Sequence, residues 1–265
     1  MIFHVATPPR MEHGGMKTSS LLLAVLALAS GHAQADDAPE FDRPGIGFSP
    51  STVGKHVVVW EQGLPDASRD RSDGLTTTTW TADTLLRVGV ADTLELQLGA
   101  DSWSRLRLRG SGIRVQDSGG GDGSVALKWA PPLANEQLSV AFKAGASLPW
   151  GRAPLGDAGH DYDLGVTAAW ALPRDRSLAF YIDRQWGEGG SGWLFSPSYG
   201  FALRPQLSAY VEAGYGTGAQ YMRAAGAGVT WRVSPRVQLD ASVLRGLDAD
   251  TTDWHGGVGV SLSFD

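Results

Sequence analysis

Few residues in this sequence are placed to do nucleophilic chemistry. The chain has six histidines and no cysteine, so a catalytic thiolate and a disulfide are both excluded. His56, His160 and His255 each lack a serine two positions later, so none of them forms a His-x-Ser pair of a base beside a serine nucleophile. A nucleophile and a base could still meet across strands, so a hydrolase is the least favoured alternative. We expect no enzymatic activity.

Metal and phosphate chemistry are equally weakly supported. His160 stands near Asp157, Asp161 and Asp163, which could hold Ca²⁺ loosely, but an acidic solvated loop explains the cluster more simply. The glycine-rich stretch at 119–123 is not a phosphate loop, because no helical pattern follows it. We therefore expect neither a metal nor a cofactor.

Charge and composition narrow the class of protein further. There are 22 Lys+Arg against 28 Asp+Glu, a net charge of −6, and no basic run, so a nucleic-acid face is excluded. The 35 glycines and 10 tryptophans indicate many turns and an aromatic-rich surface. Residues 16–35 read as a signal peptide: Lys17 precedes an apolar run from Leu21, and Ala33-Gln34-Ala35 is a cleavage site. Residues 1–15 lack this pattern and suggest an over-long start, and 36–52 are expected to be an N-terminal periplasmic segment.

The elements that must position any site are strands. Leu94, Leu96 and Leu98 alternate with Glu95 and Gln97, giving one apolar face and one polar face. Twelve such stretches occur, at about 53–62, 76–89, 93–103, 122–130, 137–148, 161–172, 177–186, 192–203, 206–217, 221–232, 236–245 and 253–264. They are longer than ordinary strands and suit tilted strands that cross a bilayer.

The connections between these stretches alternate in length. Every second one is short and rich in turn residues, at 90–92, 131–136, 173–176, 204–205 and 233–235. The others, at 63–75, 104–121, 149–160, 187–191, 218–220 and 246–252, are generally longer or richer in glycine. This alternation predicts an all-β fold over 53–265: an antiparallel outer-membrane barrel of about 12 transmembrane strands, with the short turns facing the periplasm. The alternatives are a large soluble β-sandwich and a soluble periplasmic β protein.

Tryptophans lie near the ends of the predicted strands. Two interfacial girdles would account for all ten. Those predicted beside long loops are Trp60, Trp80, Trp103, Trp150, Trp186, Trp193 and Trp254, and those beside short turns are Trp129, Trp170 and Trp231.

Several stretches, in this order and spacing, resemble a known family. They include Phe41-Asp42-Arg43-Pro44-Gly45, residues 85–96, residues 121–128, Ser147-Leu148-Pro149-Trp150-Gly151 and residues 256–264. Together they resemble the outer-membrane transporters labelled "putative MetA-pathway of phenol degradation" over nearly the whole mature chain. The resemblance implies a barrel in the outer membrane of a Gram-negative bacterium and a link to uptake of aromatic compounds, with no catalytic residues. The chain departs from a common barrel ending because Asp265 follows the terminal aromatic Phe264.

In each predicted strand every second side chain is polar or small, and we expect this row of side chains to line the lumen. Candidates are Asp83, Arg87, Glu95, Gln97, Asp101, Lys128, Lys143, Asp161, Asp163, Tyr181, Asp183, Gln185, Tyr210, Glu212, Arg232, Gln238 and Asp240. Acids outnumber bases, which predicts mild cation preference if the path is wet. The two tyrosines could offer a resting surface to an aromatic solute, or could simply fill space.

We therefore expect a porin-like channel for passive diffusion of small solutes, with aromatic or hydrophobic compounds as candidates. The alternative is a closed barrel with a structural or surface-contact role, its lumen locked by ion pairs. Expected partners are outer-membrane lipid, the small-molecule solute and the barrel assembly machinery. The sequence leaves the solute, the oligomeric state and gating open.

Overall fold

The structure, a computed structural model, describes residues 38–265 except 111, 157 and 158. The predicted signal peptide and start lie outside these residues. The described part consists of strands: β1 Val58–Gly63, β2 Asp66–Ser72, β3 Leu75–Ala91, β4 Leu94–Gly110, β5 Ile113–Gly119, β6 Gly123–Trp129, β7 Leu138–Leu148, β8 Asp161–Leu172, β9 Arg176–Gly187, β10 Gly190–Arg204, β11 Leu207–Gly218, β12 Met222–Ser234, β13 Val237–Gly246 and β14 Trp254–Phe264. Across the described ranges, no helix has the length and hydropathy needed to cross a membrane.

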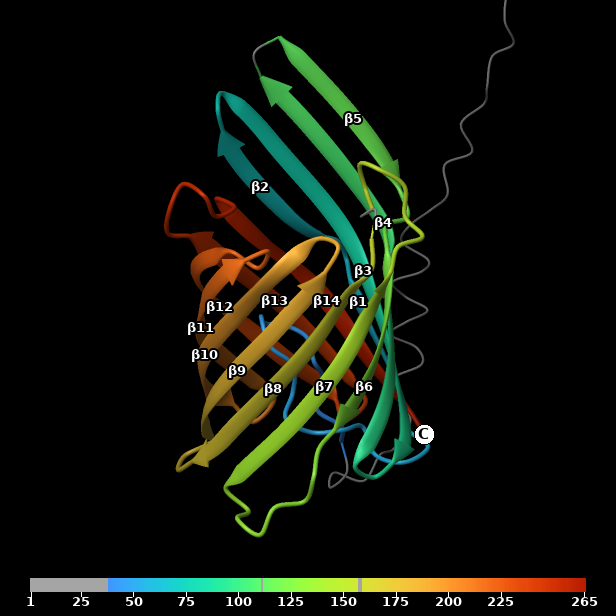
Figure 1. The fold of residues 1–265 in the computed structure, drawn as a ribbon. Coiled ribbons are helices and arrows are strands. Elements are labelled where there is room, and N and C mark those ends of the chain that lie inside the picture. The colour runs from blue at the N-terminus through green and yellow to red at the C-terminus, as the bar shows by residue number, and fades with distance from the viewer. Residues whose placement is uncertain (1–37, 111, 157–158) are drawn as a thin grey trace, which may run out of the picture. The chain divides into compact units, whose positions relative to one another are not determined.

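The strands form one closed antiparallel barrel (Figure 1). Neighbours along the chain pair in sequence from β6 to β14, and β14 closes the barrel by pairing with both β1 and β2. β1 and β2 are successive parts of one barrel strand, because both also pair with β3. β5 and β6 likewise both pair with β4. The 14 strand segments therefore make a 12-strand barrel, as predicted.

The barrel is apolar outside and polar inside. Leu98, Val211 and Val243 point outward and are 42%, 49% and 47% exposed. Arg87, Glu95, Glu61 and Lys128 point inward and are completely buried. Because oily side chains in a soluble protein would pack against each other, this inversion identifies the outer surface as one suited to lipid tails.

Two predicted long connections are strands, which corrects the predicted connections at 63–75 and 104–121. β3 and β4 are each 17 residues long, and with β2 and β5 they form a four-stranded extension beyond the rest of the barrel wall (Figure 1). The extension ends in tight hairpins, one at Asp73-Gly74, where both residues have positive φ. The prediction failed because the strands were found by an apolar row on the outer face. In the extension that row is reversed, since Leu106 and Leu108 point inward and the arginines between them point outward.

The tryptophans lie toward the two rims, with one difference from the prediction. Trp60 pairs with Leu262, which lies near the end of β14 and also pairs with Val237 just after a short turn. Trp60 therefore belongs to the short-turn rim. The strand continues through β2 well past Trp60, which moves the long-loop rim away from it. At the short-turn rim Trp129 stacks on Phe142 with their ring centroids 5.5 Å apart.

Candidate functional site: the barrel lumen

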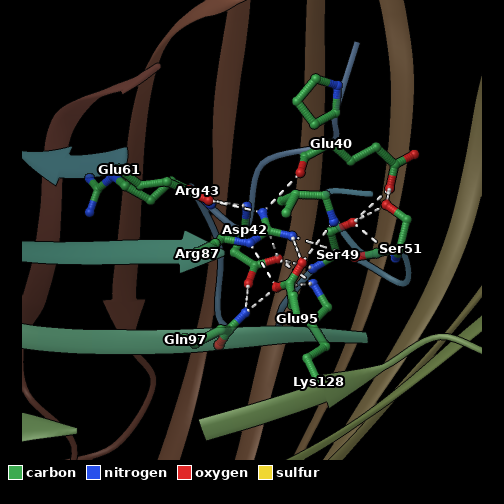
Figure 2. Close-up of polar contacts among 12 residues, drawn as sticks. Glu40, Asp42, Arg43, Ser49, Ser51, Glu61, Arg87, Glu95, Gln97 and Lys128 are labelled. Carbon is green, nitrogen blue, oxygen red and sulfur yellow. Dashed lines mark hydrogen bonds and ion pairs between the residues drawn. The ribbon is translucent and has the colours of Figure 1, made fainter. Parts of the chain in front are cut away.

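The N-terminal segment, defined here as residues 38–53, lies inside the barrel. The sequence analysis treats 36–52 as a periplasmic segment separate from the barrel, and nothing in the pattern of the strands indicates this position. Its Phe41, Phe48 and Val53 are nearly fully buried. Figure 2 shows the segment against the ends of β3, β4 and β6, with its polar groups turned toward side chains of those strands.

Asp42 is the main anchor of the segment. Its carboxylate accepts hydrogen bonds from Lys128 Nζ at 2.8 Å and from Gln97 Nε2 at 2.8 Å. Its backbone N–H donates to Glu61 Oε1 at 2.9 Å, and Ser49 N–H donates to the Asp42 carboxylate at 3.0 Å. One residue of the segment is therefore tied to three inward side chains on β1, β4 and β6.

Arg87 connects the wall to the same segment. Its guanidinium binds Glu95 through two hydrogen bonds of 2.8 and 3.0 Å, and Glu61 at 3.0 Å. It also donates to the Glu40 carbonyl at 2.9 Å, and Val53 N–H donates to Glu95 at 2.8 Å (Figure 2). Buried charges are tolerated only when paired and hydrogen-bonded, and here the segment supplies part of that pairing.

Arg43 contacts three carboxylates, on β2, β3 and β13. Its guanidinium nitrogens lie 3.1 Å from Asp66, 2.9 Å from Asp83 and 3.4 Å from Asp240. Gln238 Nε2 donates to the Arg43 carbonyl at 2.9 Å. Asp42 and Arg43 together thus connect the segment to a continuous part of the wall that runs from β13 through β1 and β2, β3 and β4 to β6.

Phe48 fills the space between two lysines and a tyrosine. Its ring centroid is 5.3 Å from Lys128 Nζ and 5.1 Å from Lys143 Nζ, within the range of cation–π contacts. It also meets the Tyr181 ring edge-on, with 5.4 Å between centroids. The segment therefore has an apolar contact with the wall as well as its polar anchors.

Three further contacts hold the middle and the start of the segment. Ile46 N–H donates to Glu212 Oε2 at 2.9 Å. Arg232 donates to the Pro39 carbonyl at 3.1 Å and lies 5.1 Å from the centroid of the Phe41 ring. These contacts place the segment across the lumen between β11, β12 and the strands named above.

The segment separates two chambers of about 330 and 380 Å³. Residues 42–45, Gly47, Phe48, Tyr181 and Glu212 line both. The first chamber, on the side of the four-stranded extension, is also lined by Asp66, Asp83, Lys143, Asp163 and His255. The second is also lined by Phe41, Tyr210, Ser198, Thr230 and Arg232. Each chamber can hold a small solute, and the segment stands between them.

The structure brings most predicted lumen residues onto these surfaces. Asp83, Arg87, Glu95, Gln97, Lys128, Tyr181, Glu212, Arg232, Gln238 and Asp240 all contact the N-terminal segment. Lys143 lies 3.8 Å from Asp163 and also contacts Phe48, and Tyr210 lines the second chamber. Asp183 and Asp161 accept hydrogen bonds from Gln220 and Gln185 respectively, and Asp101 lies beside Gly121.

Sequence reasoning missed the residues that partner this set. Asp42, Arg43, Phe48, Glu61 and Asp66 were not among the lumen candidates. The position of Glu61 could be predicted, because it lies two residues after Val59 on β1 and alternate residues of a strand point to the same side. For Asp42 and Arg43 the sequence offers only charged residues in a short segment without strand periodicity, which does not indicate burial.

The long-loop rim has its own ion pairs outside the lumen. Arg71 Nε donates to Asp253 at 3.0 Å, and Arg245 lies 3.3 Å from the same carboxylate. The hydrogen bond from Arg71 lowers the pKa of Asp253 below its usual value, and Arg245 adds to this effect. The loop before β14 is thereby joined to β2, a contact that is separate from the chambers.

Comparison with known proteins gives one family and a set of similar folds. The family model described as "Putative MetA-pathway of phenol degradation" matches residues 41–264. The COG4313 outer membrane channel from Pseudomonas putida F1 has a TM-score of 0.65 at 14% identity, covering 84% of this chain and 99% of that one. The KdgM porin in complex with disordered oligogalacturonate has a TM-score of 0.53 at 11% identity, covering 79% and 99%. No curated protein matches the sequence. At these identities the two structures show a shared fold.

Proposed function

The chain belongs to the family described as "Putative MetA-pathway of phenol degradation", and from this premise we propose that it is an outer-membrane channel for passive diffusion of small solutes. The pair of chambers within the lumen, at about 330 and 380 Å³, is the observation that carries the proposal. A purely structural barrel of this size would gain stability from a filled interior. The chain instead keeps two spaces lined by both polar and apolar side chains, one on each side of the N-terminal segment.

The N-terminal segment defines the constriction in this proposal. Passage between the chambers requires the segment to move, because residues 42–45, Gly47 and Phe48 line both of them. The contacts of Asp42 with Lys128 and of Arg43 with Asp83 hold it in place. The wild-type channel is therefore expected to be narrow or mostly closed, with flux determined by how often the segment leaves its contacts.

Small aromatic compounds are the solute class we favour. The second chamber presents Phe41, Phe48, Tyr181 and Tyr210 among hydroxyl and charged groups. Aromatic rings pack well on such surfaces, while nearby polar groups can bind a phenolic or carboxylate substituent. The family's name links its members to phenol degradation, which is consistent with this class.

Liposome swelling tests the proposal with a matched solute panel. Purified protein in liposomes is presented with benzoate-sized aromatic acids, phenols, and sugars of similar mass. We expect faster entry of the aromatic compounds than of the sugars, and slower entry when Tyr210 is replaced by Ala. Entry rates that match those of protein-free liposomes for every solute would contradict the proposal.

A closed structural barrel is the second candidate, and one observation favours it. Glu61, Arg87, Glu95 and Lys128 form a completely buried charged cluster that the segment completes. If this cluster never opens, a planar bilayer containing folded protein will carry no current and liposomes will show no solute entry. That result would select the structural role, with the hydrolase alternative tested separately by phospholipid turnover.

A further inference from the structure

Six arginines form an array on one face of the four-stranded extension. Adjacent-strand register places Arg69, Thr78, Arg107 and Gln116 in one row across β2, β3, β4 and β5. The next row contains Arg71, Thr76, Arg109 and Arg114, and the row before contains Arg105 opposite Trp80. The arginine array is defined here as Arg69, Arg71, Arg105, Arg107, Arg109 and Arg114.

The array lies on the outer face of the extension. Arg107 lies 5.5 Å from the centroid of the Trp80 ring, so the two side chains share a face. Ser104 and Thr81 point to the other side, where they hydrogen-bond to each other at 3.2 Å and Ser104 is buried. The arginines therefore continue the surface that, lower down the barrel, carries the outward apolar side chains.

The array is poorly neutralised by the protein. Within the described part of the chain, only Arg71 of the six forms an ion pair, with Asp253. Arg107 Nε has no hydrogen-bond partner there. The acids of the same strands fall on the opposite face, since Asp66, Asp70 and Asp117 sit across from Thr81, Thr77 and Leu106. This strand arrangement concentrates positive charge on the outer face.

Its height above the membrane matches a layer of charged head groups. Trp80 marks the aromatic rim, and Thr76, in the uppermost row, lies four residues before it in β3, toward the tip of the extension. At about 3.3 Å per residue and a tilt near 45°, this row stands roughly 10 Å above the tryptophan. A head-group layer extends about 5–8 Å beyond the hydrocarbon core, so it includes the row of Arg105 and the row of Arg69 and Arg107. The long side chains of the uppermost row can reach down to it.

Arginines elsewhere on the same rim repeat the pattern. Arg184, Arg223 and Arg245 lie over Trp193, Tyr215 and Trp254 at 5.3, 3.6 and 4.8 Å from the ring centroids. At the short-turn rim, no such cation–π pair occurs on an outward tryptophan among the described residues. Outward arginine–aromatic pairs are thus concentrated at the long-loop rim, the rim that the alternation of short turns and long loops assigns to the outer leaflet.

We propose that the arginine array binds the phosphate groups of the phosphorylated glycolipid that surrounds the barrel in the outer leaflet. Guanidinium groups bind phosphate through two parallel hydrogen bonds, and rows of them can hold more than one phosphate of the same lipid. The inference rests on the outer-membrane location in the proposed function but not on solute passage. Lipid bound here would brace the extension where no neighbouring barrel strand supports it.

Native mass spectrometry of the purified full chain tests this binding. The probes are lipid A with two phosphates, the same lipid after enzymatic dephosphorylation, and inorganic phosphate. We expect wild-type protein to retain bisphosphorylated lipid A and to release the dephosphorylated form. The triple variant Arg105→Gln, Arg107→Gln and Arg109→Gln should lose at least about ten-fold in apparent affinity, because hydrogen bonds to charged groups are strong.

A matched triple variant controls for the change in net charge. Arg174→Gln, Arg176→Gln and Arg204→Gln removes three exposed arginines near the short-turn rim and should retain lipid A as the wild type does. Heat-modifiable gel migration checks folding; if the array triple does not fold, Arg109→Gln alone should still weaken retention about three-fold. Unchanged retention by the array variant, equal retention of the dephosphorylated lipid, or displacement by equimolar inorganic phosphate would each overturn the proposal. Channel current is read separately and should not change in the array variant.

Discussion

Replacing Arg43 with Gln should open the channel. The guanidinium of Arg43 lies within 3.4 Å of Asp66, Asp83 and Asp240, and it belongs to the segment while all three carboxylates belong to the wall. The substitution therefore removes a contact that exists only when the segment is docked. It leaves every strand residue of the barrel unchanged.

The size of the effect follows from how buried these contacts are. Breaking a buried ion pair costs about 3–5 kcal/mol. Asp240 is fully buried, but the Asp83 side chain is 39% exposed, so solvent screening reduces its share. A net loss of about 3 kcal/mol of docking free energy would raise the undocked-to-docked ratio by about 150-fold.

Single-channel recording in planar bilayers measures that ratio. We expect the Arg43→Gln channel to spend at least about ten times more time in a conducting state than the wild type, after allowing for remaining anchors such as Asp42. Arg236→Gln is the matched control, because Arg236 pairs with Asp265 at an exposed site and should leave the current unchanged. A folded Arg43→Gln barrel with a wild-type current trace would refute the view that this ion-pair cluster holds the channel closed.

Three further changes test the fold and the lumen. A Cβ on Gly89 would lie 1.5 Å from the Gly54 carbonyl oxygen, so Gly89→Ala should reduce the yield of folded barrel in refolding assays, whereas Gly119→Ala, which meets only ordinary contacts, should refold normally. Val211→Arg places a charge on the lipid face and should lower the free energy of unfolding by about 2–4 kcal/mol in urea titrations; no loss would contradict lipid contact at this position. Asp163→Asn removes an acid from the first chamber and should shift the reversal potential in a KCl gradient toward lower cation preference, whereas an unchanged potential would mean that ions bypass the chamber.

The sequence predicted the barrel well because its signal is repeated. Residues such as Leu94 and Glu95 alternate strictly, and each strand reports the same inside-out pattern independently. The alternation did not identify the strand at Arg105–Arg109. The outer face there lies beyond the lipid tails and does not need to be apolar, so the sequence predicts a loop. The strand itself continues because pairing with β3 and β5 satisfies its backbone.

The lumen was predictable in part. Inward residues such as Arg87 and Lys128 follow from parity alone, since the polar row of a barrel strand must face inward. Their partners do not, because Asp42 and Arg43 belong to a segment whose position depends on long-range contacts and on no local periodicity. A single sequence contains no information that pairs Asp42 with a residue 86 positions away.

The central claim is that the N-terminal segment controls passage between the two chambers. A Cβ on Gly47 would lie 2.9 Å from the Tyr181 Cβ, so the double variant Gly47→Cys and Tyr181→Cys can form a disulfide after a small shift, in a chain that has no other cysteine. Flux of a small aromatic acid into liposomes should be abolished when this tether is oxidised and should return when it is reduced. Equal flux in the oxidised and reduced states would contradict the account.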